Sequence, residues 1–446
     1  MWVRGSGVFA AAHLFTAGLA WGQQTAPAPP GGSGVPTYDW LSPAPLAWTQ
    51  PETFNWSTSP VKLNAHESGS YNSNILNSAP STVLPPGQTR GDYLLTSIIG
   101  ASSKFNAWSQ QFFGDASYTV INYRDNIGFD GHNYNFDGGV NWVATSRCQG
   151  QLMAVSSQAQ APQEELFGPG LDTIRTVSAT ETGQCAIYQD VSAIVNSGVT
   201  TTNHHVVGAA AGGANALDNT TAYIQGGFSY QWASVDSLQF LTKLTETHFT
   251  NPTVTDIAQN LNASALLNVH ILNYQLVYNR TLSDIFNFSA AGGMSTTGEE
   301  TTGTHNLTPP ATPTYSVTAN WLPTPKWSIQ ISANRSVAPP VSIIAGSQVT
   351  DAEQAAITYY WTPKLSLSAT LARSNLGGNQ VAAVNQLTQA LGGFGANTLL
   401  SASLKAAYQV TPFTTASLSY QKYNRVTSGE YISSGIVLFG IDYQPQ

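Results

Sequence analysis

Charged side chains are scarce in this sequence. Only 9% of its 446 residues are Asp, Glu, Lys or Arg, whereas about a quarter of the residues of an ordinary soluble domain are charged. The polar residues are instead mostly Ser, Thr, Asn, Gln and Gly. No basic run is present and the formal net charge is -8. This balance argues against a nucleic-acid-binding protein, because such proteins neutralise phosphates with Lys and Arg.

Long apolar runs and catalytic signatures are also missing. After Gly22 no run of about 18 or more apolar residues is available for a membrane-spanning helix. There is no Gly-x-Ser-x-Gly, His-Glu-x-x-His or phosphate-binding Gly loop with Lys. His204 and His205 are adjacent, so on a strand they point to opposite faces and are poorly placed to chelate one metal. We therefore predict no enzymatic activity, catalytic residue, metal site or cofactor.

What the sequence does contain is alternation with a period of two, shown clearly between Tyr315 and Ser336. Two strands are predicted there, joined by a turn that contains Pro. The first strand has an apolar face and a polar face, formed by Tyr315, Val317, Ala319 and Trp321 against Ser316, Thr318 and Asn320. This pattern is typical of a strand with one apolar and one wet side.

Similar hairpins recur along the chain, each with an aromatic residue at the end of its first strand. Four of the turns share an aromatic-x-x-Thr pattern, as in Trp142 to Thr145. The aromatic residues lie 40 to 47 positions apart, and they are Trp142, Tyr188, Trp232, Tyr278, Trp321, Trp361 and Tyr408. A period of this kind indicates a repeat architecture.

Strand length and side-chain placement favour a membrane barrel over a soluble propeller. A propeller blade needs four short strands, whereas each repeat here has two strands of about nine to thirteen residues, long enough to cross a bilayer. The seven aromatic residues lie at strand ends, as in the interfacial girdles of membrane barrels, and we predict that they form a periplasmic girdle. The apolar faces of these repeats carry no charge, so we expect them to face lipid and the polar faces to line a lumen.

The predicted fold is all-β, a single transmembrane antiparallel up-and-down barrel over residues 61–446, with short periplasmic turns and longer extracellular loops. A first strand near Val61–Leu76, eight hairpins and a closing strand near Gly435–Tyr443 make eighteen strands. Sixteen is the alternative if a weak hairpin between Cys185 and Ala210 is misassigned. A change in the apolar phase near Leu272 predicts a β-bulge.

The end of the chain and two internal segments carry a family resemblance. Alternating Val437, Phe439, Ile441 and Tyr443 resemble the C-terminal signal that the barrel-assembly machinery reads in outer-membrane proteins. The segments VKLNAHESGSYNSNIL (61–76) and GGVNWVATSRCQGQLMAVSS (138–157), with the repeated hairpins, resemble the β-barrel porin 2 family. That family includes barrels encoded with exopolysaccharide synthesis and export genes. The resemblance implies a pore in the outer membrane of a Gram-negative bacterium, among outer-membrane lipids and lipopolysaccharide, with polysaccharide export components as candidate partners.

The alternation also predicts which side chains line the lumen. The candidates are Lys62, Asp115, Gln225, Lys243, Ser328, Gln330, Ser368, Lys405, Gln421 and Asp442. Charges of both signs among many amides and hydroxyls suit a weakly selective channel for small hydrophilic solutes such as sugars, or a barrel that takes part in exopolysaccharide export. Two alternatives stay open: a non-conducting structural or adhesive surface barrel, and an outer-membrane hydrolase with an active site at the rim.

Four further features remain in the sequence, and the last three of them leave alternatives open. Residues 1–22, with Arg4 before an apolar stretch, are a predicted secretory signal peptide. The Pro- and Gly-rich residues 23–60 that follow form a predicted periplasmic extension, which acts as a tether, a docking segment or a plug. The loop segment Asn379–Leu391 has helical spacing and either constricts the lumen or caps the surface. Cys148 and Cys185 lie near the periplasmic ends of neighbouring strands, and they either form a disulfide or remain free thiols.

Overall fold

The computed structural model describes residues 61–75, 84, 87–162, 171–207, 218–233, 235–250, 266–283, 285–301, 304–307, 311–338, 347–378, 397–427 and 430–443. The predicted signal peptide, the predicted extension over residues 23–60 and the predicted loop helix Asn379–Leu391 lie outside these residues.

The described residues form one antiparallel sheet of nineteen strands. The strands are β1 (Lys62–Asn72), β2 (Asp92–Ala107), β3 (Gln110–Tyr123), β4 (Gly131–Thr145), β5 (Cys148–Pro162), β6 (Leu171–Ala186), β7 (Val191–Val207), β8 (Asn219–Ala233), β9 (Asp236–Phe249), β10 (Leu266–Ser283), β11 (Phe286–Thr301), β12 (Thr304–Leu307), β13 (Thr312–Thr324), β14 (Trp327–Ala338), β15 (Gln348–Thr362), β16 (Leu365–Gly378), β17 (Asn397–Thr411), β18 (Thr414–Thr427) and β19 (Glu430–Tyr443). A short 3-10 helix, η1 (Ile127–Phe129), follows β3. In the described part of the chain, no helix has the length and apolar character needed to span a membrane.

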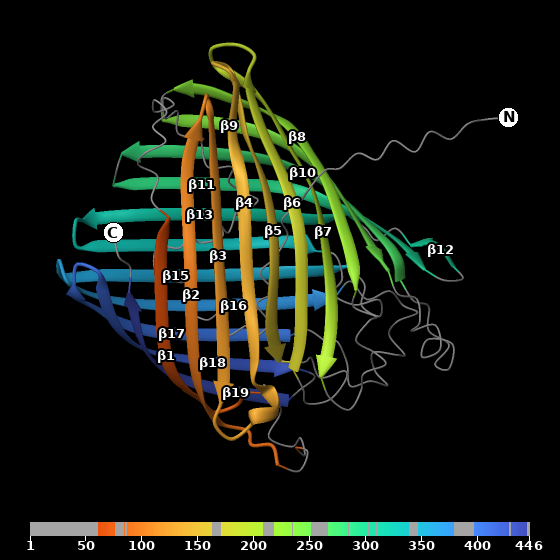
Figure 1. Cartoon of the computed structure of the whole chain (residues 1–446). Coiled ribbons are helices and arrows are strands. Elements are labelled where there is room, and N and C mark those ends of the chain that lie inside the picture. The colour runs from red at the N-terminus through yellow and green to blue at the C-terminus, as the bar shows by residue number, and fades with distance from the viewer. Residues whose placement is uncertain are drawn as a thin grey trace.

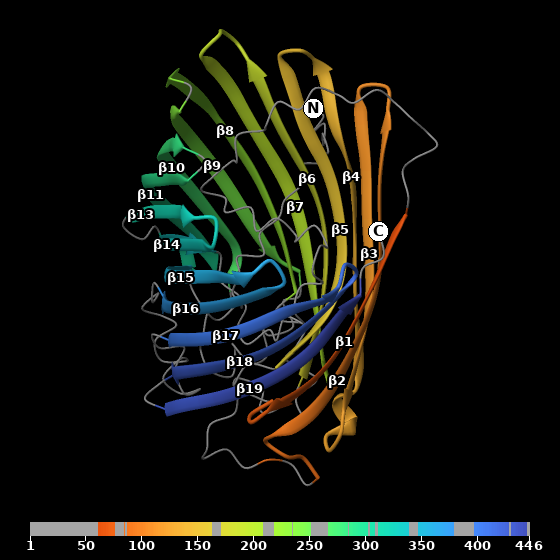
Figure 2. The same cartoon turned by 90° about the vertical axis from the view of Figure 1, so that its left-hand side faces the viewer.

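Eighteen of the strands make the wall of a closed barrel. β12 has four residues and pairs with the end of β11, while β11 also pairs with β13. The sheet closes because β1 pairs with β2 on one side and with β19 on the other, where Ala65–Asn72 match Tyr443–Ile436. Figures 1 and 2 show the barrel, with β1–β7 running across the direction of the opposite wall, β13–β19. The predicted eighteen-stranded antiparallel barrel is confirmed.

Eight tight turns gather at one end of the barrel, and most of the connections at the other end are longer. The tight turns follow β2, β4, β6, β8, β10, β13, β15 and β17. In three of them the Thr of the aromatic-x-x-Thr pattern bonds to the backbone of the turn: Thr145 Oγ1 accepts hydrogen bonds from the backbone N–H groups of Arg147 and Cys148, at 3.2 and 3.1 Å. Thr324 and Thr411 accept equivalent bonds in their own turns. Lys62 and Tyr443, where the wall begins and ends, lie at the tight-turn end, which bacterial barrels place in the periplasm.

Several sequence-based boundaries need correction. The hairpin suspected of being misassigned is real, since β6 and β7 pair from Leu171 to Ala186, so sixteen strands is wrong. The wall strands are 11 to 18 residues long, and all except β1, β13 and β14 are longer than the predicted nine to thirteen residues. The apolar alternation marks only the part that faces lipid, whereas backbone pairing continues past it. β19 therefore begins at Glu430 rather than near Gly435.

The two faces of the wall differ in exposure as well as in polarity. On β13, Trp321 is 47% exposed and Ser316 is 5% exposed. Side chains on the convex outer face diverge and stay accessible, whereas side chains on the concave inner face converge. The apolar face of Tyr315–Ser336 is therefore the outside of the barrel, and its polar face is the lumen side.

The predicted β-bulge near Leu272 is wrong. β10 pairs with β9 without a register shift from Asn268 to Arg280, and its pairing with β11 is also continuous at Leu272. The apolar phase changes because Val269, Ile271 and Val277 point into the lumen. Val277 packs there with Ile194, Leu241 and Ala291. An apolar residue on these strands therefore does not always face lipid.

The outer face also carries charged side chains on several strands. Glu67 of β1 is in register with Ile441, and Glu181 of β6 is in register with Leu152; both carboxylates lie on the exposed outer side. Glu353 of β15 and Arg373 of β16, which are direct cross-strand partners, are also exposed at outward positions. The charge-free outer face expected from the repeats therefore does not extend over the whole length of these strands.

Candidate functional site: the lumen wall

The lumen wall is the surface that a passing solute would contact. All ten residues predicted to line it lie on wall strands, and the cross-strand register places them on the inner face. Their accessibility differs: Lys62, Gln330 and Lys405 are exposed, Asp115, Ser328, Ser368 and Gln421 are half-buried, and Gln225, Lys243 and Asp442 are buried. Their part in conduction stays a prediction.

The accessible side of the lumen is formed by β14–β18. Ser328, Thr358, Ser368 and Lys405 follow one another on neighbouring strands as cross-strand partners. Hydroxyl groups exchange hydrogen bonds with water or solutes as both donors and acceptors. This side of the wall is therefore a hydrated surface with one exposed cation.

Charges of opposite sign lie on nearby strands in another stretch of the lumen wall. Asp115 of β3 and Asp137 of β4 are direct cross-strand partners, and in the same line Ser102 of β2 is the partner of both Asp115 and Lys62 of β1. The amide of Asn135 donates to Asp137 Oδ1 at 3.1 Å. Because both signs are present, the wall has no large field of one sign.

The seam between the first and last strands holds a buried polar pair. His66 Nδ1 of β1 is hydrogen-bonded to Asp442 Oδ1 of β19, and both side chains are buried on the lumen face. Because Gly440 has no side chain, there is space beside it for the imidazole ring of His66. The sequence analysis identified Asp442 but missed His66, because 376 positions separate them.

A continuous line of polar side chains runs across the lumen wall from β2 to β13. We call this line the amide track. Its members are cross-strand partners on successive wall strands, and they are Asn106, Gln111, Asn141, Gln151, Thr182, Asn196, Gln225, Lys243, Asn273, Ser295 and Thr312. Seven of the eleven are Asn or Gln.

Hydrogen bonds between carboxamides join the first residues of the amide track, at the tight-turn end of the barrel. Gln111 Nε2 donates to Asn106 Oδ1 at 2.9 Å, and Asn141 Nδ2 donates to Gln111 Oε1 at 3.1 Å. Gln151 Nε2 then donates to Asn141 Oδ1 at 2.9 Å. Farther along, Asn196 Nδ2 donates to Gln225 Oε1 at 3.1 Å. The donors point in one direction along the first four residues, an arrangement in which hydrogen bonds strengthen one another.

The single charged member of the amide track is covered. Lys243 is 6% exposed, and its Nζ lies 4.0 Å from the centre of the Tyr223 ring, which is also on the lumen face. A cation over an aromatic face is stabilised by the ring quadrupole. Sequence reasoning identified Gln225 and Lys243 but missed the rest of the track, because the line appears only once the register between strands is known.

The residues of the predicted aromatic girdle lie on the outer face, at the tight-turn ends of the hairpins. On the outer face, Trp232 stacks on Tyr278 with ring centroids 5.9 Å apart, and Trp327 lies 4.6 Å from Tyr359. Trp142, Trp321, Trp361 and Tyr408 also lie on outward positions of their strands, and Tyr188 lies exposed in the β6–β7 turn. The outward positions of β19 are Val437, Phe439, Ile441 and Tyr443, the residues of the predicted assembly signal.

The outer surface fits a bilayer. It is a closed band of exposed aliphatic side chains with aromatic residues beside the tight turns, the arrangement found in transmembrane barrels of the bacterial outer membrane. The protein is therefore an outer-membrane barrel.

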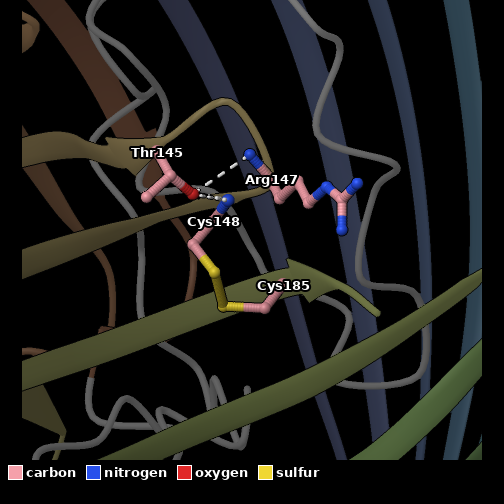
Figure 3. The surroundings of a disulfide bond; sticks show 4 residues. All are labelled: Thr145, Arg147, Cys148 and Cys185. Atoms are coloured by element: carbon pink, nitrogen blue, oxygen red, sulfur yellow. Dashed lines mark hydrogen bonds between the residues drawn. A yellow bond between two sulfur atoms is a disulfide. The ribbon is translucent and has the colours of Figure 1, made fainter. Parts of the chain in front are cut away.

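A disulfide links the two cysteines at the periplasmic end. Cys148 begins β5, Cys185 lies near the end of β6, and the two are direct cross-strand partners bonded through their sulfur atoms (Figure 3). Next to them the ring of Trp142 covers Gly150, where a Cβ would collide with the ring and with the Thr182 carbonyl. The disulfide alternative left open by the sequence is the one that the structure adopts.

No family model matches the chain, and no curated protein matches it. OprD of Pseudomonas aeruginosa matches with a TM-score of 0.44 and 12% identity, over 89% of this chain and 97% of that chain. OccK2 (OpdF) of the same organism, in complex with glucuronate, gives 0.45 and 9%, over 87% and 99%. The FrpB iron transporter of Neisseria meningitidis gives 0.42 and 10%, over 86% and 82%.

These likenesses are too distant to indicate what the chain does. All three TM-scores are below 0.5, so the function is inferred from the geometry of the barrel itself. Membership of the β-barrel porin 2 family stays a prediction from the sequence.

Within the described part of the chain, no group of three or more His, Cys, Asp or Glu side chains could hold a metal ion. His204 and His205 lie on opposite faces of β7, with their cross-strand partners Ile174 and Thr173 on β6. The absence of enzymatic activity stays a prediction.

Proposed function

We propose that the protein is a non-enzymatic outer-membrane channel for small hydrophilic solutes. The observation that supports this proposal most is the accessible lumen wall of β14–β18. Exposed Gln330 and Lys405, with Ser and Thr around them, face the interior of a closed barrel whose outer face is apolar. A polar lumen inside an apolar exterior is what a water-filled pore requires.

The charge pattern of the lumen supports weak ion selectivity. The exposed cations Lys62 and Lys405 face the same interior as the Asp115–Asp137 pair. Rings of one sign give pores their ion selectivity. A wall of mixed sign, with amides and hydroxyls between the charges, suits neutral solutes.

Exopolysaccharide export is the more specific version of this proposal. It is supported by the resemblance to the β-barrel porin 2 family and by the many uncharged hydrogen-bonding groups on the wall. In this version the barrel works with polysaccharide export components, after insertion by the barrel-assembly machinery among outer-membrane lipids and lipopolysaccharide.

A second candidate function is a barrel that does not conduct at rest. On the inner face Leu241 is 1% exposed, and Val269 and Val277 are 0% exposed. Such complete burial of apolar lumen side chains favours a filled or narrowed region beside β9–β11. A structural or adhesive surface barrel would share this feature.

Uptake of sugars into proteoliposomes separates the two candidates. Liposomes that contain the purified, disulfide-bonded barrel should swell in isotonic glucose, and swelling should slow as the sugar is lengthened from one to several residues. Swelling no faster than in protein-free liposomes would support the non-conducting barrel. Hydrolysis of ester or peptide substrates by the same sample would instead support the hydrolase with an active site at the rim.

A further inference from the structure

We propose that the amide track is a binding path for a neutral, polyhydroxylated chain such as an oligosaccharide. The inference rests on the proposed channel function and adds to it where the solute is held and by which chemical groups.

The track reaches from one rim of the barrel to the other. Asn106 is the next-to-last residue of β2 at the tight-turn end, and Thr312 is the first residue of β13 at the long-loop end. Membrane-barrel strands tilt by about 40°, so a line of cross-strand partners also climbs along the barrel axis. The track takes ten steps of about 4.8 Å from one strand to the next. With this tilt it rises about 30 Å along the barrel axis, close to the thickness of the hydrocarbon core.

Every side chain of the amide track is polar, whereas the neighbouring lines of the wall mix polar and apolar side chains. Along the neighbouring line of cross-strand partners on one side of the track, the lumen-facing side chains include Phe113, Met153 and Ile271. Along the line on the other side they include Ile194 and Leu241. The amide track is therefore a polar strip between partly apolar borders, which favours a solute that follows the strip.

The chemistry of the track matches sugar hydroxyls. A carboxamide has two N–H donors and two acceptor lone pairs. The chain of amides uses one donor and one acceptor position of Gln111 and of Asn141. These bonds hold the side chains in place while a donor and an acceptor position on each remain for a solute. Neighbouring hydroxyls on a sugar ring offer the same mixture of donors and acceptors.

Unpartnered polar atoms near the long-loop part of the track point independently to a ligand. Asn273 Oδ1 and Ser295 Oγ belong to buried side chains, 7% and 1% exposed, and have no hydrogen-bond partner among the described residues. Gln275 Nε2 and Thr314 Oγ1, on the neighbouring line of cross-strand partners, are also buried and have no hydrogen-bond partner among the described residues. Buried polar atoms normally have a partner, and a chain of hydroxyls in the track would supply one.

Charge argues for a neutral ligand. Lys243 is the one ionisable member of the amide track, and it is covered by Tyr223. A pathway for acidic glycans would be expected to expose several Arg or Lys side chains, since carboxylates bind best to charged donors.

The test measures how maltohexaose, a neutral linear oligosaccharide, blocks ion current through the barrel in planar bilayers. The track variant is Asn141→Leu with Gln151→Met, which keeps side-chain size and removes the amides. The matched control is Asn287→Leu with Asn320→Leu, a hydrogen-bonded pair of carboxamides on the lumen face of β11 and β13 outside the track. We expect the track variant to raise the half-blocking concentration at least tenfold with ion conductance within twofold of the wild type, and the control to change it less than twofold. An unchanged track variant, or an equal loss in the control, would overturn the proposal.

A milder variant keeps the test decisive if the double variant does not fold. Gln111→Glu has nearly the same shape, and it removes the donor to Asn106 and adds a charge to the track. We expect it to weaken the block by maltohexaose at least threefold; an unaffected block would count against the track. Block of the wild type by oligogalacturonate as strong as by maltohexaose would overturn the preference for neutral chains.

The design separates failure of the track from failure of the channel. If the wild type conducts but maltohexaose does not block it, the track is refuted and the channel stands. If the wild type does not conduct, the channel proposal fails. The track is then tested by titrating the detergent-folded barrel with maltohexaose and following tryptophan fluorescence. Binding that only the track variant loses would support it, and no binding to the wild type would refute it.

Discussion

A charged residue placed on either face of β17 tests which side of the wall meets lipid. Leu404 lies at the middle of Asn397–Thr411 and is 60% exposed on the outer face, whereas Ser403 precedes it and faces the lumen. An Arg that faces lipid near the midplane costs about 2–4 kcal/mol. Leu404→Arg should therefore lower the folding equilibrium constant about 30- to 700-fold, since about 1.4 kcal/mol corresponds to tenfold. Ser403→Arg should have a small effect because the guanidinium stays in water.

Reversible urea unfolding in lipid vesicles, followed by tryptophan fluorescence, measures both variants under the same conditions. The neighbouring positions share strand, depth and backbone pairing, so the difference between them isolates the environment of the side chain. A larger loss of stability in Ser403→Arg than in Leu404→Arg would refute the assignment of the two faces, and equal losses would also contradict it.

Three other features of the barrel give sharp expectations. Replacing Cys148 and Cys185 by Ser removes a link across a sequence separation of 37 residues, and should lower the free energy of unfolding by up to about 4 kcal/mol; identical urea midpoints for the oxidised wild type and the double variant would contradict a structural role for the bond. His66→Ala leaves buried Asp442 without its seam partner and should destabilise the barrel by about 3–5 kcal/mol, seen as a lower temperature of the heat-modified gel shift; a shift at the wild-type temperature would show that the pair contributes nothing. Lys405→Glu exchanges an exposed lumen cation for an anion and should move the reversal potential in a KCl gradient towards cation selectivity, whereas an unchanged potential would remove Lys405 from the conducting path.

The number and placement of the strands could be read from the sequence because the bilayer imposes a strict pattern. Residues such as Leu404 and Trp321 must alternate with polar neighbours when one side faces lipid and the other faces water. The tight turns are also visible, since Thr145 and its equivalents bond to the backbone only locally.

The predictions from sequence that were wrong have a common physical cause. Lipid excludes polar residues more strictly than the lumen excludes apolar ones, so Val269 and Val277 can point inward and imitate a β-bulge. Likewise Glu67 and Glu181 on the outer face could not be assigned until the register of β1 and β6 was known.

Contacts between distant strands could not be predicted from a single sequence. The pair formed by His66 and Asp442 depends on closure of the barrel. The amide track depends on the register of successive hairpins: a slip of one residue in β5 would turn Gln151 outward and break the line. The individual lumen candidates followed from alternation, but their grouping did not.

The most direct test of the account is the current through the wild-type protein in a planar bilayer. Purified barrel that shows a heat-modified gel shift and an intact disulfide should insert and give stepwise ion currents with a reversal potential close to zero in a KCl gradient. Such currents would establish a water-filled, weakly selective lumen. Folded protein that inserts but gives no current above the bare bilayer would contradict the channel.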